Sequence, residues 1–142
     1  MTSYVFSADQ DHLDRARVHA WLAEESYWAK GRPRDKQESA IDHSLNFGMY
    51  VADESGVPAA QVAYARVVTD HTTFAWLADV FVDTSHRGTG LGKELITNVL
   101  AALEPMELRR VLLKTNDAHG LYEQYGFAPV KAPGDWMVHG TQ

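Results

Sequence analysis

The sequence contains no cysteine, no long hydrophobic run and fewer basic than acidic residues. Without cysteine the chain has no disulfide, no thiol nucleophile and no thiolate metal ligand. No run approaches the roughly 18 consecutive apolar residues that a membrane-spanning helix needs. Lys and Arg number 13 against 19 Asp and Glu, and the net charge of −6 argues against a nucleic-acid surface. We therefore expect neither a membrane nor a nucleic-acid partner.

Two further signals are missing. The N-terminal residues have no basic start and apolar stretch of the kind that marks a secretory signal peptide, so we expect a cytoplasmic location. The 7 His residues form no H-E-x-x-H pair or other metal-ligand spacing, so we expect no metal site. What is present is the composition of an ordinary globular protein, with 142 residues, 45% hydrophobic and 23% charged. This length suits a single domain over residues 1–142.

Helical and strand-like hydrophobic patterns alternate along the chain, which predicts an α/β or α+β fold. Asp11 is the predicted N-cap of the first helix, and Pro105 ends the third. The run over 73–82 is almost uniformly apolar, which is typical of a central strand buried on both faces. Helices are expected over 11–26, 33–45, 86–103 and 117–125, and strands over 4–8, 47–53, 58–70, 73–82, 109–115, 127–130 and 136–140, the last two at the sheet edge.

The stretch "HRGTGLGKEL", residues 86–95, places three glycines just before the body of a helix. Glycine there costs about 0.5–1 kcal/mol relative to alanine, so a backbone without side chains must serve a purpose. The first N–H groups of a helix lack internal partners and attract anions, and Arg87 adds a bidentate cation. The pattern indicates a phosphate-binding loop, or alternatively a plain tight turn between strand and helix.

Two motifs together resemble those of the GNAT superfamily of acyl-CoA N-acyltransferases. One is R-x-x-G-x-G, and the other is A-x-x-x-Y-E-x-x-G-F within "DAHGLYEQYGF". They occur in the family's order, and the resemblance extends over most of the chain; "SYWAKGR", "ARVVTD" and "LADVFVD" resemble a group of small bacterial GNAT proteins. The matching positions are Arg87, Gly90, Gly92, Ala118, Tyr122, Glu123, Gly126 and Phe127.

The resemblance implies a fold and a cofactor. The implied fold is a mixed, mostly antiparallel sheet of six to seven strands with about four helices, in which two splayed central strands hold acetyl-CoA. The pantetheine arm would pair with Val80, Phe81 and Val82, and an N–H group, most simply that of Val80, would face the oxyanion. Many relatives carry Asn where Thr115 stands here, so the neighbouring Asn116 becomes the expected cofactor contact. The pyrophosphate would lie on the backbone of Arg87, Gly88, Thr89, Gly90, Leu91, Gly92 and Lys93.

The resemblance and the residues suggest two catalytic side chains. Tyr122 stands where the family places a tyrosine near the CoA sulfur, either as the general acid that protonates the departing thiolate or as a ring packed beneath the cofactor. Asp79 is the only charged residue between Phe74 and Val82. A buried carboxylate is expensive, so Asp79 is expected either to act as a base with a raised pKa, through water, or to anchor a neighbouring loop through hydrogen bonds.

The acceptor site is expected to have an aromatic wall of Tyr27, Trp28, Phe74 and Trp76, with Arg66 available for a substrate carboxylate, although core or surface positions explain each residue as well. The resulting hypothesis is direct transfer of acetyl from acetyl-CoA to a primary amine of a small molecule. The alternatives are a non-catalytic acyl-CoA-binding sensor and an acetyltransferase for protein lysines or N-termini. A homodimer is compatible with each of them.

Overall fold

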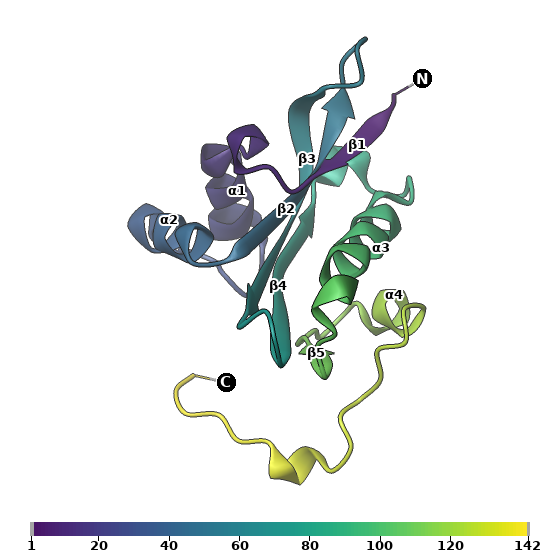
Figure 1. Cartoon of the computed structure of the whole chain (residues 1–142). Coiled ribbons are helices and arrows are strands. Elements are labelled where there is room, and N and C mark those ends of the chain that lie inside the picture. The colour runs from purple at the N-terminus through teal and green to yellow at the C-terminus, as the bar shows by residue number, and fades with distance from the viewer. Residues whose placement is uncertain (1, 142) are drawn as a thin grey trace.

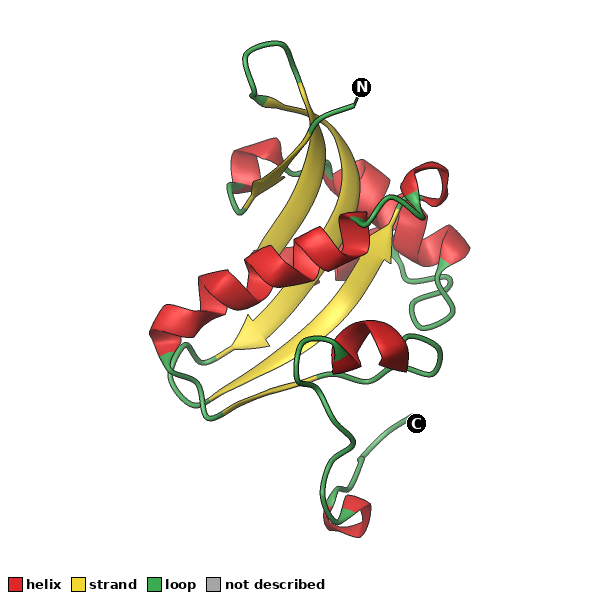
Figure 2. Cartoon of the chain, turned by 90° about the vertical axis from the view of Figure 1, so that its right-hand side faces the viewer, coloured by secondary structure: helices red, strands yellow, loops and turns green. Residues whose placement is uncertain are grey.

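The computed structural model describes residues 2–141, so Met1 and Gln142 of the predicted domain 1–142 lie outside the described residues. A curled sheet runs through the centre in the order β1-β2-β3-β4-β5, with antiparallel neighbours except for the parallel pair β4 and β5 (Figures 1 and 2). The strands are β1 (Tyr4–Ser7), β2 (Leu45–Ala52), β3 (Pro58–Thr69), β4 (Phe74–Val82) and β5 (Arg110–Leu112).

Helices lie on both faces of the sheet. They are α1 (Arg15–Ala20), α2 (Arg34–Asp42), α3 (Leu91–Leu103) and α4 (His119–Glu123). A π-helical turn, Trp21–Glu25, extends α1 close to the predicted end of the first helix. The predicted N-cap of α1 was wrong: Asp14, not Asp11, accepts a hydrogen bond from the N–H of Arg17, because a separate 3₁₀ turn occupies Gln10–His12.

Two hydrophobic clusters hold the helices against the sheet. On one face Leu95, Ile96 and Val99 of α3 pack on β2, β3 and β4, and Figure 2 shows this helix crossing the strands. On the other face Trp21 stacks on Phe81 with ring centroids 5.6 Å apart, in a cluster that also contains residues of α1 and α2. Because both faces are covered, β4 alternates buried and half-buried residues rather than exposing one side.

Strand β4 pairs with β3 along its length but with β5 only at its start. Its first residues, Phe74–Trp76, pair with Arg110–Leu112 of β5, and beyond Trp76 the two strands separate. On the β3 side the register shifts between Tyr64 and Arg66, and Asp79 has a left-handed φ of 52° at this irregularity. The shift is a β-bulge, a feature that redirects side chains and is over-represented near active sites. The separation of β4 and β5 leaves one edge of the second half of β4 open.

The prediction of six to seven strands was wrong, because residues 2–141 form five. The predicted edge strands 127–130 and 136–140 are absent, and every residue from 128 to 141 is exposed. Pro129 cannot donate a hydrogen bond to a ladder, and the segment instead makes a local turn in which the N–H of Trp136 donates to the carbonyl of Pro133. Strand β5 has three residues rather than the predicted seven, so a further strand would find few backbone groups to pair with.

Candidate active site

A cavity of about 450 Å³ opens where β4 and β5 separate. Its walls come from the segment after the π-helical turn, the end of β4, the glycine loop with the first turn of α3, and α4. The structure therefore brings together most of the predicted site. The predicted residues that line the cavity are Tyr27, Trp28, Val80, Phe81, Val82, Arg87, Gly88, Gly90, Leu91, Gly92, Lys93 and Tyr122.

The glycine loop leaves the start of α3 uncovered. Gly88 and Gly90 have left-handed φ values of 80° and 81°, a conformation that glycine adopts without strain. Gly90 is the N-cap residue and supplies no side-chain hydrogen bond, so the first N–H groups of α3 have no side-chain cap. A Cβ at Gly92 would meet only Val82, at 3.7 Å, so packing within the protein does not require glycine there. This end of the helix is built to be approached from outside.

Hydrogen bonds fix the loop on both sides. Tyr4 Oη and His86 Nδ1 lie 2.8 Å apart, which ties the loop to β1. Arg87 Nε donates to the carbonyl of Val82 at 2.9 Å, and its guanidinium carbon lies 5.1 Å from the centre of the Phe81 ring. Thr89, which does not line the cavity, donates from Oγ1 to the carbonyl of His86 at 2.8 Å. The cation of Arg87 is thus held beside the open end of α3.

The open edge of β4 faces the same cavity. The N–H of Asp83 donates to the carbonyl of Val62 in β3 at 2.9 Å. Because successive residues of a strand direct their N–H groups to opposite edges, the N–H groups of Val82 and Val80 are expected at the open edge. Val80, Phe81 and Val82 all line the cavity, so an extended ligand arm has a strand edge to pair with.

Tyr122, on α4, lies between the core and the cavity. Its side chain is 8% exposed and its ring meets that of Phe127 edge-on, with centroids 5.7 Å apart. Burial, aided by the nearby Tyr27 and Asp117, raises the pKa of its phenol above the ordinary value, to about 12. The hydroxyl therefore keeps its proton at neutral and mildly alkaline pH.

Asp79 lies beside this site, and its buried carboxylate is fully engaged. Trp28 Nε1 donates to it at 3.0 Å, Arg32 Nη1 at 2.8 Å and Arg66 Nε at 2.8 Å. Burial opposes ionisation, but the guanidinium groups of Arg32 and Arg66 outweigh it, and the pKa of Asp79 lies below its ordinary value. The raised pKa expected of a base is thus wrong for this structure, because two cations share the carboxylate.

Arg32 was not predicted from the sequence as a site residue. It lies in the stretch "SYWAKGR" that already drew attention, but it is 47 residues from Asp79 along the chain. A lone carboxylate in an apolar strand requires a cationic or hydrogen-bonding partner. The sequence therefore indicated that Asp79 has a partner but did not identify it. Arg32 Nη1 also donates to Gln37 Oε1 at 3.0 Å, while Gln37 Nε2 is a buried nitrogen without a partner among the described residues.

The predicted acceptor residues divide into two groups. Tyr27 and Trp28 line the cavity, with ring centroids 4.9 Å apart, and Tyr27 Oη accepts from the N–H of Asn116 at 3.2 Å. Phe74 and Trp76 do not line it, because they lie at the start of β4 where β5 is still paired. Arg66 does not line it either, and its Nη1 donates to Ser44 at 3.1 Å in addition to the contact with Asp79.

Thr115 has a local structural role at the start of α4. Its Oγ1 accepts from the N–H groups of Asp117 and Ala118, at 3.3 and 3.0 Å. Asn116, the expected cofactor contact, has an exposed side chain outside the cavity lining, so that contact stays a prediction. The hydroxyl of Thr115 thus supports the turn of the chain into α4.

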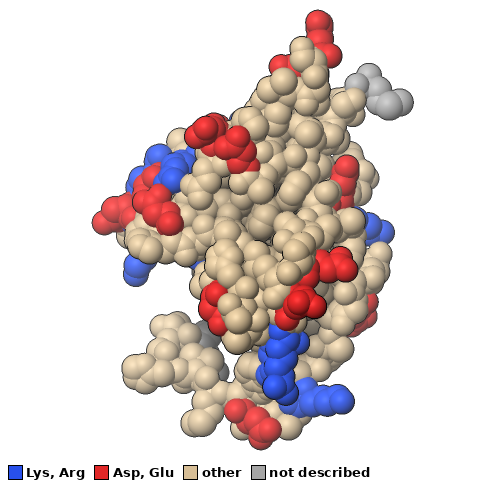
Figure 3. Space-filling view, viewed as in Figure 1, with Lys and Arg blue, Asp and Glu red and all other residues tan. Residues whose placement is uncertain are grey.

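The described residues also bear on the binding of metal ions, membranes and nucleic acids. Within residues 2–141 no group of three or more His, Asp and Glu residues is placed to hold a metal ion. None of the helices in this range is long and apolar enough to cross a membrane. On the face shown in Figure 3 the Lys and Arg side chains occupy separate spots among acidic ones, unlike the continuous basic stripe of a nucleic-acid-binding surface.

Comparison with known proteins gives a consistent result. The model of the acetyltransferase (GNAT) family matches residues 14–127. A candidate acetyltransferase of Gibberella zeae is 30% identical over 133 residues, which cover 84% of this chain and 75% of that protein. A crystal structure of a GNAT-family protein from Xanthomonas campestris pv. campestris is 43% identical, with a TM-score of 0.88 over 99% of this chain and 95% of that one. Rv2747 of Mycobacterium tuberculosis, solved with CoA, shares the fold at 14% identity, with a TM-score of 0.70 over 89% of this chain and 73% of its own.

Proposed function

Since the chain belongs to the GNAT family of acetyltransferases, we propose that it transfers an acetyl group from acetyl-CoA directly to a primary amine of a small molecule, and that it works as one domain. The observation that carries this proposal is the cavity in which the uncapped start of α3, the open edge of β4 and Tyr122 meet.

The residues around the cavity fit acetyl-CoA. The first N–H groups of α3 and the Arg87 guanidinium suit a pyrophosphate, and Gly92 leaves room for it to approach. The edge of β4 at Val80 and Val82 suits the amide groups of a pantetheine arm, which pair as an added strand does. When bound, acetyl-CoA supplies an acetyl group activated as a thioester.

Two groups of the chain then serve the chemistry. The N–H of Val80 is the proposed donor to the oxygen on which negative charge develops during transfer, and a fixed backbone donor of this kind strongly stabilises such charge. Tyr122 holds a proton at Oη, and we propose that this proton goes to the leaving group. Both groups belong to elements packed on the main core, so their positions are set before the ligand arrives.

Asp79 is proposed to hold Trp28 and the bulge before Val80 in place rather than to act as a base. Its oxygens already accept from Trp28, Arg32 and Arg66, and its lowered pKa makes it a weak proton acceptor. The carboxylate joins the segment that carries Trp28 to the bulge that precedes Val80. The acceptor amine therefore enters neutral or first loses a proton to water, and Tyr27 and Trp28 form the proposed wall beside it. The proton that nitrogen loses when the amide forms also goes to water, and Tyr122 recovers a proton from water after protonating the thiolate.

The first experiment measures thermal melting with acetyl-CoA, CoA, ATP and NADH at equal concentrations. A ligand at 100 times its dissociation constant adds about 2.7 kcal/mol of stability, which raises the Tm of a chain of this size by roughly 5–10 °C. We expect acetyl-CoA and CoA to produce this shift and ATP and NADH to produce little. Equal shifts with all four ligands, or no shift with CoA, would contradict the cofactor assignment.

The second experiment identifies the acceptor class. Release of CoA is followed with a thiol reagent, for which this chain is well suited because it contains no cysteine. A panel of amino acids, polyamines and other small amines is compared with peptides that present lysine or a free N-terminus. Turnover with a small amine supports the proposal, turnover with peptides alone assigns the activity to protein acetylation, and tight CoA binding without turnover would favour a sensor.

A further inference from the structure

Asp79 shares its carboxylate with two arginines, and the three side chains together have one positive charge in excess. Arg32 Nη1 and Arg66 Nε both lie 2.8 Å from the same oxygen, Asp79 Oδ2, so the two guanidinium groups are close neighbours. Within residues 2–141 neither guanidinium forms an ion pair with a second carboxylate. The neighbouring Tyr64 adds no negative charge, because burial raises the pKa of its phenol. We call Arg32 and Arg66 the arginine pair.

The buried residue that contacts Arg32 is neutral. Gln37, on α2, is fully buried, and its Oε1 accepts from Arg32 Nη1 at 3.0 Å. Its Nε2 has no partner among the described residues. A glutamate at this position would supply the missing negative charge with nearly the same shape, whereas glutamine leaves the excess charge in place. Because charge away from water is costly unless it is paired, the arginine pair favours the binding of an anion.

The arginine pair is partly open to solvent. The side chain of Asp79 is 1% exposed, whereas those of Arg32 and Arg66 are 19% and 14% exposed. Among the described residues, Arg32 Nε and Arg66 Nη2 have no acceptor. Solvent therefore reaches the cations but hardly reaches the carboxylate, and N–H groups remain for an oxyanion such as a carboxylate or a phosphate.

The arginine pair borders the proposed acceptor site. Trp28 Nε1 donates to the Asp79 carboxylate at 3.0 Å, and Trp28 also lines the cavity. Asp79 immediately precedes Val80, whose N–H is the proposed donor to the reacting oxygen. An amine held beside Trp28 therefore needs only a short chain to bring an anionic group to Arg32 and Arg66.

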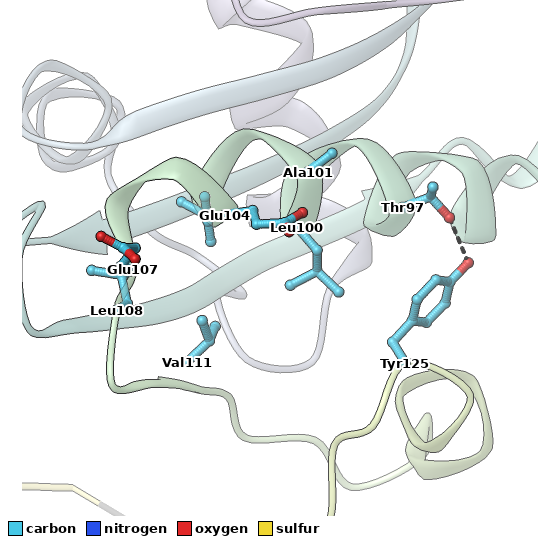
Figure 4. Close-up of a pocket in the computed structure, with 9 residues that line it drawn as sticks. Thr97, Leu100, Ala101, Glu104, Glu107, Leu108, Val111 and Tyr125 are labelled. Carbon is cyan, nitrogen blue, oxygen red and sulfur yellow. Dashed lines mark hydrogen bonds between the residues drawn. The ribbon is translucent and has the colours of Figure 1, made fainter.

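A second pocket of the molecule does not suit an anion. It encloses about 480 Å³ between the second half of α3, β5 and Tyr125, and Figure 4 shows Leu100 and Val111 beside this space. The described residues that line it include Glu104 and Glu107 but no Lys or Arg. Its charge would repel an anionic group, which leaves the arginine pair as the better site.

We propose that the acceptor is a small amine that also carries an anionic group, a carboxylate or a phosphate, and that Arg32 and Arg66 bind this group. The inference rests on the proposed function, because it names the class of acceptor for the same site. Hydrogen bonds between charged groups of ordinary strength correspond to roughly 10- to 100-fold in affinity. The anionic group of the acceptor thus contributes to specificity as well as to binding.

The first test compares matched acceptors at saturating acetyl-CoA. Amino acids are compared with their amides, and aminoalkyl phosphates with the corresponding amino alcohols, with rates corrected for the fraction of neutral amine. We expect kcat/KM to be roughly 10- to 100-fold higher for the anionic member of at least one pair, and the pair that responds shows whether the group is a carboxylate or a phosphate. Equal or higher values for every uncharged member would overturn the proposal.

Gln37→Glu tests the charge without removing either arginine. The new carboxylate supplies the missing negative charge, so the preference for anionic acceptors should disappear. Arg66→Gln leaves Arg32 to pair with Asp79 and should have the same effect. A purely structural role would lower kcat/KM for both members of a pair alike and leave their ratio unchanged. A wild-type ratio in both variants would therefore overturn the role of the arginine pair.

Gln10→Glu is the matched control for the added charge. Gln10 Oε1 also accepts from an arginine, Arg15 Nη2, at 3.4 Å, but both residues lie outside the cavity lining and apart from Asp79. This variant is expected to keep the wild-type preference. Loss of the preference here as well would show that net charge, and not the arginine pair, determines it.

Melting curves separate failure of this inference from failure of the proposed function. With CoA saturating, N-acetyl amino acids and N-acetylated aminoalkyl phosphates are added to the wild type and to Gln37→Glu. We expect at least one of them to raise the Tm of the wild type and none to raise that of the variant. Such a shift without any turnover would contradict the acetyltransferase function alone. Turnover of uncharged amines without such a shift would overturn the anionic acceptor, and the absence of both turnover and shift would overturn both.

Discussion

The Tyr122 hydroxyl combines a place at the cavity with a firmly held proton. Its pKa of about 12 means that the donor form predominates over the whole range in which an amine loses its proton. A phenol with such a pKa is a weaker acid than free tyrosine, so the proposed proton transfer to a thiolate, whose conjugate acid has a pKa near 8.5, is uphill and depends on the departure of the thiolate. The proposed role of Val80 belongs to its backbone N–H, which every substitution except proline leaves in place.

Tyr122→Phe is expected to lower kcat by about 10- to 1000-fold while acetyl-CoA affinity changes little, because the ring still packs but the proton donor is lost. For the wild type, kcat/KM should rise with pH as the amine deprotonates and show no decline due to Tyr122 below about pH 11. Steady-state kinetics and calorimetric binding of acetyl-CoA check both points. An unchanged kcat would rule out the role of general acid.

Asp79 contributes to stability in a pH-dependent way. Its pKa is lowered in the folded state, so its contribution is present above the unfolded pKa of about 3.9 and is lost as the pH falls through the lower folded value. Asp79→Asn removes one partner of a buried charge cluster, and we expect a loss of about 3–5 kcal/mol at neutral pH and a flatter dependence of stability on pH below the unfolded pKa.

Urea unfolding at several pH values measures this effect, with the exposed Asp135→Asn as the control. A different result would restore the role of base: an Asp79→Asn protein with the wild-type Tm whose activity falls selectively at low pH. The two roles are thereby separated by stability as well as by rate.

At the scale of elements, two glycines at the start of α3 serve different needs: one permits a left-handed backbone, and the other leaves room for a ligand. Gly90 has a left-handed φ of 81°, whereas Gly92 lies within the helix and has open space around it. Gly90→Ala is therefore expected to cost about 1–2 kcal/mol of stability. Gly92→Ala is expected to keep or raise the Tm, because alanine favours a helix by about 1 kcal/mol, and to weaken acetyl-CoA binding.

Melting curves with and without acetyl-CoA measure both changes at once. Gly120→Ala in α4 is the matched control, since its added Cβ meets nothing within 4 Å and Gly120 lies outside the cavity lining. If Gly92→Ala binds acetyl-CoA as well as the wild type, the phosphate does not approach this turn of the helix.

The elements that could be predicted were those with local signals. The apolar stripe of α3 and the stop at Pro105 placed its end correctly, and the glycine loop and Tyr122 were placed on one cavity. The partners of Asp79 could not be predicted from the sequence, because Arg32 approaches it only through tertiary packing. The C-terminal strands were wrong because alternation shows which residues suit a strand, whereas pairing depends on a free neighbouring edge and on the course of the chain.

At the scale of the whole molecule, the faces of the sheet and its edge at β5 differ in how well they are covered by other described residues. Both sheet faces are covered by helices, whereas the edge at β5 and residues 128–141 remain exposed. A homodimer was left open by the sequence, and in a homodimer unfolding includes dissociation. In that case the Tm of the full chain is expected to rise with protein concentration. Calorimetric scans over a range of concentrations provide the comparison, and a constant Tm for the full chain would count against a dimer.

The cluster around Asp79 also bears on the order in which the molecule assembles. The carboxylate meets Arg66 across 13 residues of sequence, but Arg32 and Trp28 across 47 and 51. Because contacts between residues close in sequence form faster, we expect the β3–β4 hairpin to form early and the segment carrying Trp28 and Arg32 to dock later. Substitution at Asp79 should therefore raise the unfolding rate and change the folding rate little. The contacts of this carboxylate would then determine the lifetime of the native state.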